Sequence, residues 1–242
     1  MNARVVPYSL VIFDLDGTLA DSFPWFLRNV NDVADRFGFS RVGDDDIASL
    51  RQAGSREILR RLQVPLWKLP AIVRHMRRMK AAHLADIPLF PGTETMLRGL
   101  RDGGLTLALV SSDNEANARR QLGEAAGLFA HFDCGASLFG KAAKFRRVVK
   151  RAGVQPSQAL AIGDEIRDIE AAHAAGIACG AVTWGYAAPE ALRALKPDMI
   201  LEMVEDIVSC LKGHHDETQP SDSPTHLDSE AVSTKFGSCT WL

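Results

Sequence analysis

Two aspartates, Asp14 and Asp16, follow a short apolar run and precede Gly17 and Thr18. Alternate residues of a strand point to opposite faces, but a glycine after the pair allows a sharp turn that can direct both carboxylates into one pocket. One carboxylate can then attack an electrophile while the other transfers a proton. Taken alone, such a segment also suits a solvated turn or a calcium loop. The pair predicts a catalytic site provided that further groups join it.

Further polar side chains follow later apolar runs in the same manner. They are Ser111, Ser112 and Asn114 after the run 105–110, Lys141 ahead of a helical segment, and Gly163, Asp164 and Asp168 after the run 159–162. Ligands of an open parallel sheet bind beyond the carboxyl ends of its strands, so we expect these side chains to surround one site. Ser112 and Asn114 are predicted to contact the substrate.

The predicted site gathers the acidic residues Asp14, Asp16, Asp164 and Asp168. Carboxylates that converge on one point repel each other unless a cation joins them. A hard divalent ion with oxygen ligands, most simply Mg²⁺, is the natural complement. The sequence therefore predicts a magnesium site where three acidic residues of this group converge, with Lys141 balancing the remaining negative charge.

The elements that must position these residues alternate along the chain. Apolar runs predict strands over 8–13, 105–110, 159–162 and 177–182, and helical periodicity predicts helices over 93–101, 115–125, 144–152 and 169–175. This order is typical of an α/β fold with a doubly wound parallel sheet. The stretch 21–85 shows helical spacing and no convincing strand, which predicts a small α-helical cap inserted after the first strand.

Three regions follow from this pattern. We expect a core domain from residues 1–20 and 86–212, a helical cap domain from 21–85, and a disordered tail over 213–242. The tail is rich in polar residues and proline, and it carries too little apolar surface to offset the entropy of ordering.

The bulk composition narrows the classes of partner. The chain has 242 residues, of which 46% are hydrophobic and 24% charged, and a formal net charge of -2. Such a chain lacks the basic field that attracts nucleic acid or an anionic membrane surface. The N-terminus lacks the pattern of a signal peptide, and no apolar stretch approaches a membrane span. These features predict a cytoplasmic protein that binds a small molecule and binds neither nucleic acid nor a membrane. They do not predict the oligomeric state.

The segment 14–22, Asp-Leu-Asp-Gly-Thr-Leu-Ala-Asp-Ser, closely resembles the first motif of the haloacid dehalogenase (HAD) superfamily. Ser111, Lys141 and the segment 163–168 resemble its second, third and fourth motifs in the same order, and the resemblance covers roughly residues 8–210. The helical insert and the segments 90–92 and 183–186 resemble the phosphoglycolate phosphatase-like branch. The resemblance implies a Rossmann-like HAD core and a Mg²⁺-dependent phosphatase of a small phosphorylated metabolite, with phosphoglycolate one candidate.

The resemblance also implies a role for each matching residue. Asp14 is expected to attack phosphorus and form an aspartyl-phosphate, while Asp16 protonates the leaving alkoxide and then deprotonates the hydrolytic water. The Asp14 side chain, the Asp16 backbone carbonyl and Asp164 are expected to hold Mg²⁺.

Four further residues are expected to support these groups. Asp168 would support the metal site directly or from behind its ligands. Ser111 would donate a hydrogen bond to a phosphoryl oxygen, Thr18 would orient the aspartates, and Lys141 would neutralise charge on the nucleophile and on the transferring group.

Several assignments stay open at the level of sequence. Lys144 is an alternative to Lys141, and Glu165 is either a further carboxylate near the metal or an exposed side chain. Arg51, near a glycine in the insert, is a candidate for contact with the substrate. The basic run 74–80 on a helix is interpreted as a solvated face.

Other functions compete with a phosphatase. A phosphomutase of the β-phosphoglucomutase kind shares the two aspartates and the metal, and a catalytically silent HAD-fold interaction protein would keep the fold as a scaffold. A haloacid dehalogenase proper would give Asp16 no acid or base duty. A phosphonatase needs a lysine in the insert that forms a Schiff base, and the candidates are Lys68 and Lys80.

Overall fold

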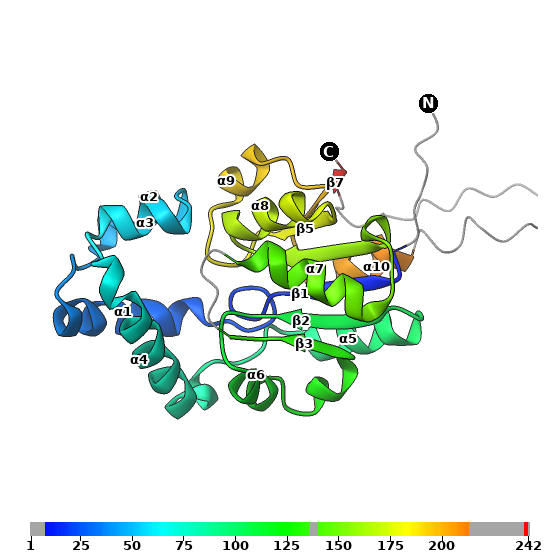
Figure 1. Cartoon of the computed structure of the whole chain (residues 1–242), viewed down its shortest axis with the longest axis horizontal. Coiled ribbons are helices and arrows are strands. Elements are labelled where there is room, and N and C mark those ends of the chain that lie inside the picture. The colour runs from blue at the N-terminus through cyan, green and yellow to red at the C-terminus, as the bar shows by residue number, and fades with distance from the viewer. Residues whose placement is uncertain (1–7, 136–139, 213–239, 242) are drawn as a thin grey trace, which may run out of the picture.

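A computed structural model describes residues 8–135, 140–212 and 240–241 of the chain. Its centre is a sheet in the strand order β3-β2-β1-β4-β5-β6-β7, in which β1 to β6 run parallel and β7 pairs antiparallel with β6 (Figure 1). The strands are β1 (Leu10–Phe13), β2 (Thr106–Val110), β3 (His131–Asp133), β4 (Ala159–Gly163), β5 (Ala178–Val182), β6 (Met199–Leu201) and β7 (Thr240–Trp241). The predicted α/β fold with a doubly wound parallel sheet is confirmed.

The four strands predicted from apolar runs are present, and β3, β6 and β7 were not predicted. Periodicity needs four or more residues to identify a strand, whereas β3 and β6 have three residues each and β3 carries polar side chains at both ends. Strand β7 falls within the segment that was predicted to be disordered. The rest of that segment, 213–239 and 242, lies outside the described residues.

Ten α-helices accompany the sheet in the described part of the chain. The helices that precede the second strand are α1 (Phe23–Phe37), α2 (Asp44–Arg51), α3 (Ser55–Arg61), α4 (Leu69–Ala82) and α5 (Thr93–Asp102). The later helices are α6 (Glu115–Leu122), α7 (Lys141–Ala152), α8 (Ile166–Ala175), α9 (Pro189–Ala194) and α10 (Asp206–Lys212). The helices predicted over 93–101, 115–125, 144–152 and 169–175 correspond to α5, α6, α7 and α8.

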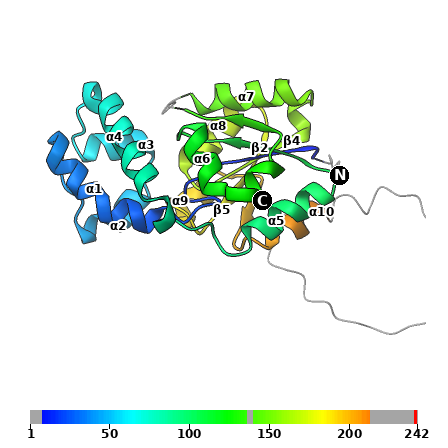
Figure 2. The same ribbon diagram turned by 90° about the horizontal axis from the view of Figure 1, so that it is seen from below.

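Strand β1 is fully buried because helices cover both faces of the sheet. Val11 and Phe13 join an apolar core together with side chains of α5, α6 and α10, and Leu10 and Ile12 join a second core with α7, α8 and α9. Figure 2 shows α7 on one side of the sheet and α5 and α10 on the other. The three layers leave the carboxyl ends of the strands uncovered, where polar side chains can gather.

Helices α1 to α4 form a separate unit beside these strand ends, which we call the cap (Figure 1). The cap has its own apolar cluster, whose buried members are Val33, Leu62, Val64 and Ile72. The chain enters and leaves the cap through adjacent segments, since Ala20 bridges Leu89 and the Asp21 N–H donates to the Pro88 carbonyl at 2.9 Å. The helical character predicted for 21–85 agrees with these elements.

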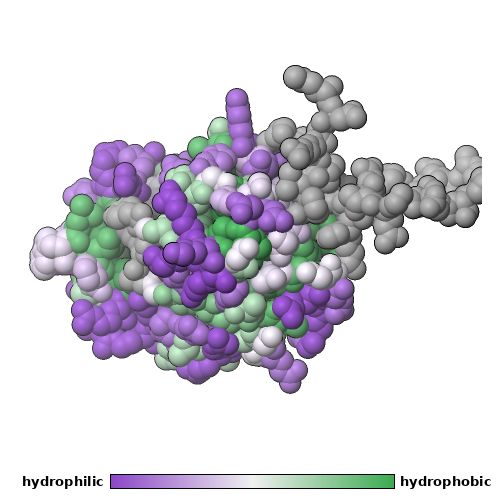
Figure 3. Space-filling view, turned by 45° about the vertical axis from the view of Figure 1, so that its right-hand side comes forward, coloured by the Kyte–Doolittle hydropathy of each residue, from purple (hydrophilic) through white to green (hydrophobic). Residues whose placement is uncertain are grey.

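The outer surface is mixed in character. Figure 3 shows one face on which hydrophilic groups surround smaller hydrophobic patches. Among the described residues, no helix is long and apolar enough to span a membrane.

Candidate active site

Residues from four separated segments meet beyond the ends of β1, β2 and β4. Asp14 follows β1 directly, Ser111 follows β2, and Asp164 follows β4, while Asp168 lies in the first turn of α8. Carboxylate oxygens of Asp14, Asp164 and Asp168 lie within 4.8 Å of one another, and all three residues are buried. The convergence that the strand order predicted is therefore present.

Two glycines allow the chain to approach this acidic cluster closely. Gly17 has a left-handed φ of 80°, and a Cβ there would lie 2.2 Å from Asp164 Oδ2. A Cβ on Gly185 would lie 2.3 Å from Asp164 Cβ. Real Cβ atoms do not approach other atoms so closely, so only glycine lets the 14–18 turn and the 185–186 loop close around Asp164.

Lys141 is the cation that contacts the predicted nucleophile. Its Nζ lies 2.7 Å from Asp14 Oδ2 and 2.5 Å from Asp168 Oδ1, and its side chain is only 11% exposed. Burial alone would raise the pKa of Asp14, but the nearby charges of Lys141 and Arg167 outweigh burial and lower it. Asp14 is therefore an anion at neutral pH.

Lys144, the alternative to Lys141, has a different position. Its Nζ donates hydrogen bonds to the backbone carbonyls of Ser111 at 2.8 Å, Gly135 at 2.7 Å and Asp133 at 3.3 Å. Lys144 therefore ties together the segments that follow β2 and β3, whereas Lys141 contacts carboxylates of the cluster.

Asp164 is the most buried carboxylate of the cluster, with no exposed surface. It accepts hydrogen bonds from Thr18 Oγ1 and from the Tyr186 N–H, each at 2.8 Å. Burial, followed by the charges of Glu165, Asp168 and Asp14, raises its pKa well above the ordinary value. The positive charge of Lys141 does not fully neutralise the negative charge of these carboxylates. The remaining negative charge suits a bound divalent cation.

Asp168 makes contacts of a different kind. Its Oδ2 accepts the N–H groups of Asp164 and Glu165 at 3.2 Å each, and its Oδ1 accepts from Lys141. The side chain thereby caps α8 and fixes Lys141 beside Asp14. These contacts suit the supporting position that was expected of Asp168.

Asp16 faces the cap and contacts a residue that the sequence analysis placed on a solvated face. Lys80 of α4 lies 2.6 Å from Asp16 Oδ1 and 3.2 Å from Asp113 Oδ2, and only 7% of its side chain is exposed. The prediction of a solvated face was wrong for Lys80. A usable signal was the helical spacing, because Lys80 shares one face of α4 with the apolar Ile72 and Met76.

The residues after β2 have distinct environments. Ser111 is buried, and its Oγ accepts the Asp113 N–H at 3.0 Å. The Asn114 side chain accepts the Asn117 N–H at 2.8 Å and caps α6, a position typical of asparagine. The Ser112 carbonyl accepts a short hydrogen bond from Arg77 of the cap. Ser112 lines the cavity described below and Asn114 does not.

Arg51 and Glu165 are both engaged in contacts within the protein. Arg51 Nε donates to the Tyr186 carbonyl at 2.9 Å, and its Nη2 donates to the Gly185 carbonyl at 3.0 Å. This cap residue therefore binds the loop beside Asp164. Glu165 pairs with Arg167 and is half-buried. Glu165 is thus not a freely exposed side chain.

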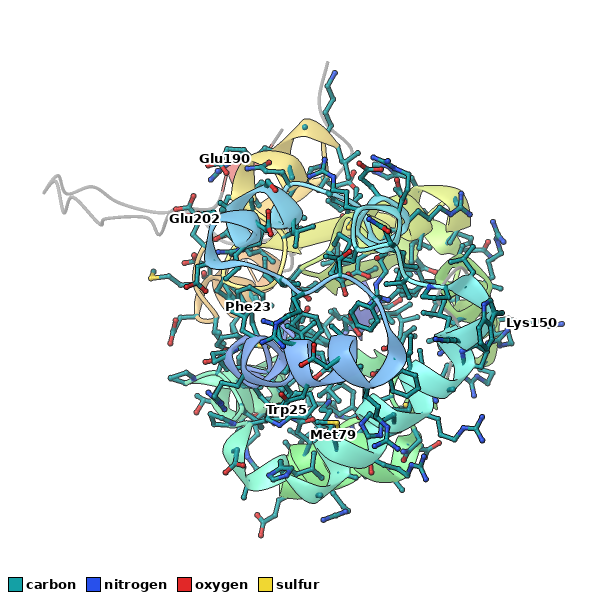
Figure 4. The ribbon with its side chains drawn as sticks, turned by 90° about the vertical axis from the view of Figure 1, so that its left-hand side faces the viewer. Phe23, Trp25, Met79, Lys150, Glu190 and Glu202 are labelled. Atoms are coloured by element: carbon teal, nitrogen blue, oxygen red, sulfur yellow. The ribbon has the colours of Figure 1, made fainter. Side chains whose placement is uncertain are left out.

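A cavity of about 370 Å³ lies between the cap and the core. Its core wall includes Asp16, Ser112, Asp113 and Arg167, and its cap wall is mainly apolar. Figure 4 views the molecule from the cap side, where Phe23 and Trp25 of α1 lie well inside the outline while Lys150 and Glu202 lie near its edge. The cavity opens onto Asp16, so a ligand within it can contact that carboxylate.

Residues 11–182 match the family model described as haloacid dehalogenase-like hydrolase. The chain belongs to this family. It is 34% identical to the phosphoglycolate phosphatase of Synechococcus elongatus, an alignment that covers 83% of this chain and 96% of the relative. Phosphoglycolate phosphatase 1 of Pseudomonas aeruginosa is 28% identical, over 90% of this chain and 85% of the relative. These relatives confirm the predicted family and the predicted enzyme class, a phosphatase.

Solved structures agree with the fold of this HAD family member. A predicted phosphatase from Clostridium acetobutylicum superposes with a TM-score of 0.73 at 22% identity, covering 86% of this chain and 100% of that protein. A predicted phosphoglycolate phosphatase from Haemophilus somnus has a TM-score of 0.68 at 24% identity, covering 86% and 99%. At these identities the likeness concerns the fold.

Proposed function

We propose that this protein is a Mg²⁺-dependent phosphomonoester hydrolase that acts on a small phosphorylated metabolite through an aspartyl-phosphate on Asp14. The observation that carries the proposal is the ion pair between Asp14 and Lys141 at 2.7 Å within a buried acidic cluster. This pair keeps a carboxylate anionic and positioned at the end of β1, as a nucleophile requires.

The chemistry needs two displacements at phosphorus. An Asp14 oxygen attacks the phosphorus atom, the bond from phosphorus to the alkoxide breaks, and Asp16 gives the alkoxide a proton. Asp16 then takes a proton from water as the water oxygen attacks the same phosphorus atom. Inorganic phosphate leaves and the Asp14 carboxylate is restored.

Three neighbouring residues support these steps. Lys141 stabilises negative charge on the transferring group, and the Ser111 hydroxyl, whose oxygen accepts the Asp113 N–H, can donate its own hydrogen to a phosphoryl oxygen. Thr18 holds Asp164 through its 2.8 Å hydrogen bond and so keeps the acidic cluster aligned.

The residues present fit a divalent metal ion. Asp14 and Asp164 would hold it together with the backbone carbonyl of Asp16, and Asp168 would support Lys141 from behind. The raised pKa of Asp164 reflects the buried charge that such an ion would offset. When bound, the ion supplies a positive charge that stabilises the developing charge of the phosphoryl group.

The names of the relatives make phosphoglycolate the first substrate to test. Arg51 and Ser112 line the cavity beside Asp16 and stay candidates for contact with the substrate. We extend the proposal to the division into a core of residues 1–20 and 86–212 and a cap of 21–85, which the separate apolar cluster of the cap supports. The cytoplasmic location stays a prediction.

The ionic state of Lys80 bears on the phosphonatase alternative. Burial lowers the pKa of an amine, but the charges of Asp16 and Asp113 outweigh burial and raise the pKa of Lys80. An amine held protonated by two carboxylates cannot attack a carbonyl to form a Schiff base. The position of Lys80 therefore disfavours a phosphonatase.

The decisive experiment replaces the nucleophile. Asp14→Asn should lower Mg²⁺-dependent release of phosphate from phosphoglycolate and p-nitrophenyl phosphate by at least about 10³-fold. The wild type, quenched in acid during turnover, should carry one added phosphoryl group on the peptide that contains Asp14. Asp35→Asn, at an exposed position of α1, is the matched control and should retain full turnover. Wild-type turnover by Asp14→Asn would exclude the mechanism, and a wild type inert toward many esters would favour the scaffold alternative.

A further inference from the structure

The cavity between cap and core begins where the predicted phosphoryl site ends. Among the described residues, its walls include Asp16 and Ser112 but not Asp14, Ser111 or Lys141. Asp16 is the residue proposed to protonate the departing oxygen. A phosphate ester seated on Asp14 therefore directs its leaving group past Asp16 and into this cavity.

The cap wall of this cavity is apolar and incompletely covered. Helices α2 and α3 contain no buried residue, although Leu50, Ile58 and Leu59 line the cavity. Phe23 and Phe26 of α1 add aromatic surface to the same wall. Apolar side chains that line a cavity are better covered by an apolar ligand than by water.

The charged groups gather at the core end of the cavity. Lys80 lies against Asp16 and Asp113, and Arg167 lies against Glu165. The cavity is thus polar beside the ester and apolar farther into the cap. Such a gradient suits an alcohol whose hydroxyl end is polar and whose far end is apolar.

The size of the cavity agrees with a larger occupant than a two-carbon acid. Its volume of about 370 Å³ falls within the range of roughly 300–1,000 Å³ that is typical of sites for drug-sized ligands. The glycolate part of phosphoglycolate would leave most of the apolar wall in contact with water.

We propose that the cavity binds the leaving group of the substrate and that this leaving group is an alcohol with a sizeable apolar part, such as an aryl or branched alkyl group. The inference rests on the proposed phosphatase function and names its substrate class. In the reaction the alcohol departs with the proton of Asp16, and water supplies the oxygen that releases phosphate from Asp14.

The test compares esters that differ in size but not in the basicity of the leaving group. Ethyl phosphate and 2-phenylethyl phosphate both release a primary alkoxide, so a difference in kcat/KM reports on binding of the phenyl ring. With Mg²⁺ present, kcat/KM for the phenylethyl ester should exceed that for the ethyl ester by at least about 30-fold. The alcohol product 2-phenylethanol should inhibit competitively at concentrations where ethanol has no effect.

A cavity-filling variant locates this preference in the cap. Val73 lines the cavity from α4, and Val73→Trp should lower the ratio of the two kcat/KM values by at least about 10-fold. Ala71→Trp places the same side chain at an exposed position of the same helix and should keep the wild-type ratio. The ratio within one variant does not depend on how much of the protein is correctly folded.

The failure of this inference is distinguishable from failure of the proposed function. Equal kcat/KM for the two esters, or phosphoglycolate preferred over both with no inhibition by 2-phenylethanol, would overturn the assignment of an apolar leaving group while leaving the phosphatase intact. An unchanged ratio in Val73→Trp would also overturn it. Hydrolysis of none of the esters would instead contradict the proposed function.

Discussion

Replacement of Lys80 by methionine tests whether the cap is held against Asp16 and Asp113 in solution. The Lys80 side chain is 7% exposed and that of Asp113 only 3%, so Lys80→Met leaves a buried carboxylate without its cation. Removal of one partner from a buried ion pair costs about 3–5 kcal/mol in the free energy of unfolding. The Asp16 side chain is 26% exposed, and water replaces part of the lost contact there. We therefore expect a loss of about 3 kcal/mol, at the low end of this range.

Urea denaturation of four proteins measures this contribution as a double-mutant cycle. Asp113→Asn keeps the hydrogen bonds that Oδ1 accepts from the Asn114 N–H and from Asn117 Nδ2, and it removes only the charge facing Lys80. The double variant, Lys80→Met with Asp113→Asn, should lose at least about 1 kcal/mol less stability than the sum of the losses in the two single variants. Arg78→Met, at an exposed position of the same helix, should change stability by less than about 0.5 kcal/mol. A change of the same small size in Lys80→Met, with no coupling to Asp113, would refute the placement of α4 against the core.

Two further predictions concern the acidic cluster. Lys141→Met should lower kcat by about 10²–10³-fold, because Lys141 makes the 2.7 Å ion pair with Asp14. Lys144→Met should mainly lower the melting temperature, because Lys144 Nζ donates to three backbone carbonyls. Equal losses of kcat in the two variants would contradict this distinction. Mg²⁺ affinity should fall as the pH falls, by about tenfold per pH unit below the raised pKa of Asp164, because the ion binds the carboxylate and displaces its proton. Calorimetry in two buffers of different ionisation enthalpy should detect that proton, and a dissociation constant independent of pH would speak against the assignment.

The raised pKa of Asp164 also determines whether stability rises or falls with pH. Between the unfolded and the folded pKa the native state holds a proton that the unfolded chain has lost. The contribution of Asp164 to the stability of the metal-free protein therefore declines as the pH rises through this window. Bound Mg²⁺ opposes the decline, because it stabilises the ionised form.

The acidic cluster was predictable because it depends on strands with strong sequence signals. Strands β1 and β4 are continuous apolar runs that are buried on both faces, and their register places Phe13 beside Ile162. A parallel register brings the residues after each strand to one level, so Asp14 and Asp164 had to meet. Their meeting follows from local patterns and one general rule of topology.

The contacts between cap and core were not predictable in the same manner. Lys80 and Arg51 lie on helices rich in charged residues. The helical spacing places Lys80 on an apolar face of α4, but it does not identify the core surface against which that face docks. The Asn114 side chain caps α6 through its oxygen, and its contact with the substrate stays a prediction. Local sequence predicts where an element begins, and tertiary docking decides which of its polar groups reach the site.

Asp16 joins the two halves of this molecule. Its backbone belongs to the tight turn of the core, where the Gly17 N–H donates to the Ala20 carbonyl, while its side chain is held by Lys80 of the cap. In the proposed mechanism, Asp16 needs one carboxylate oxygen free to exchange a proton with the leaving group or with water. Lys80 contacts Oδ1, which leaves Oδ2 for the leaving-group oxygen. Under the proposed mechanism, the cap therefore holds the acid–base residue as well as lining the cavity for the substrate, and we expect an isolated core domain to lack a correctly positioned acid.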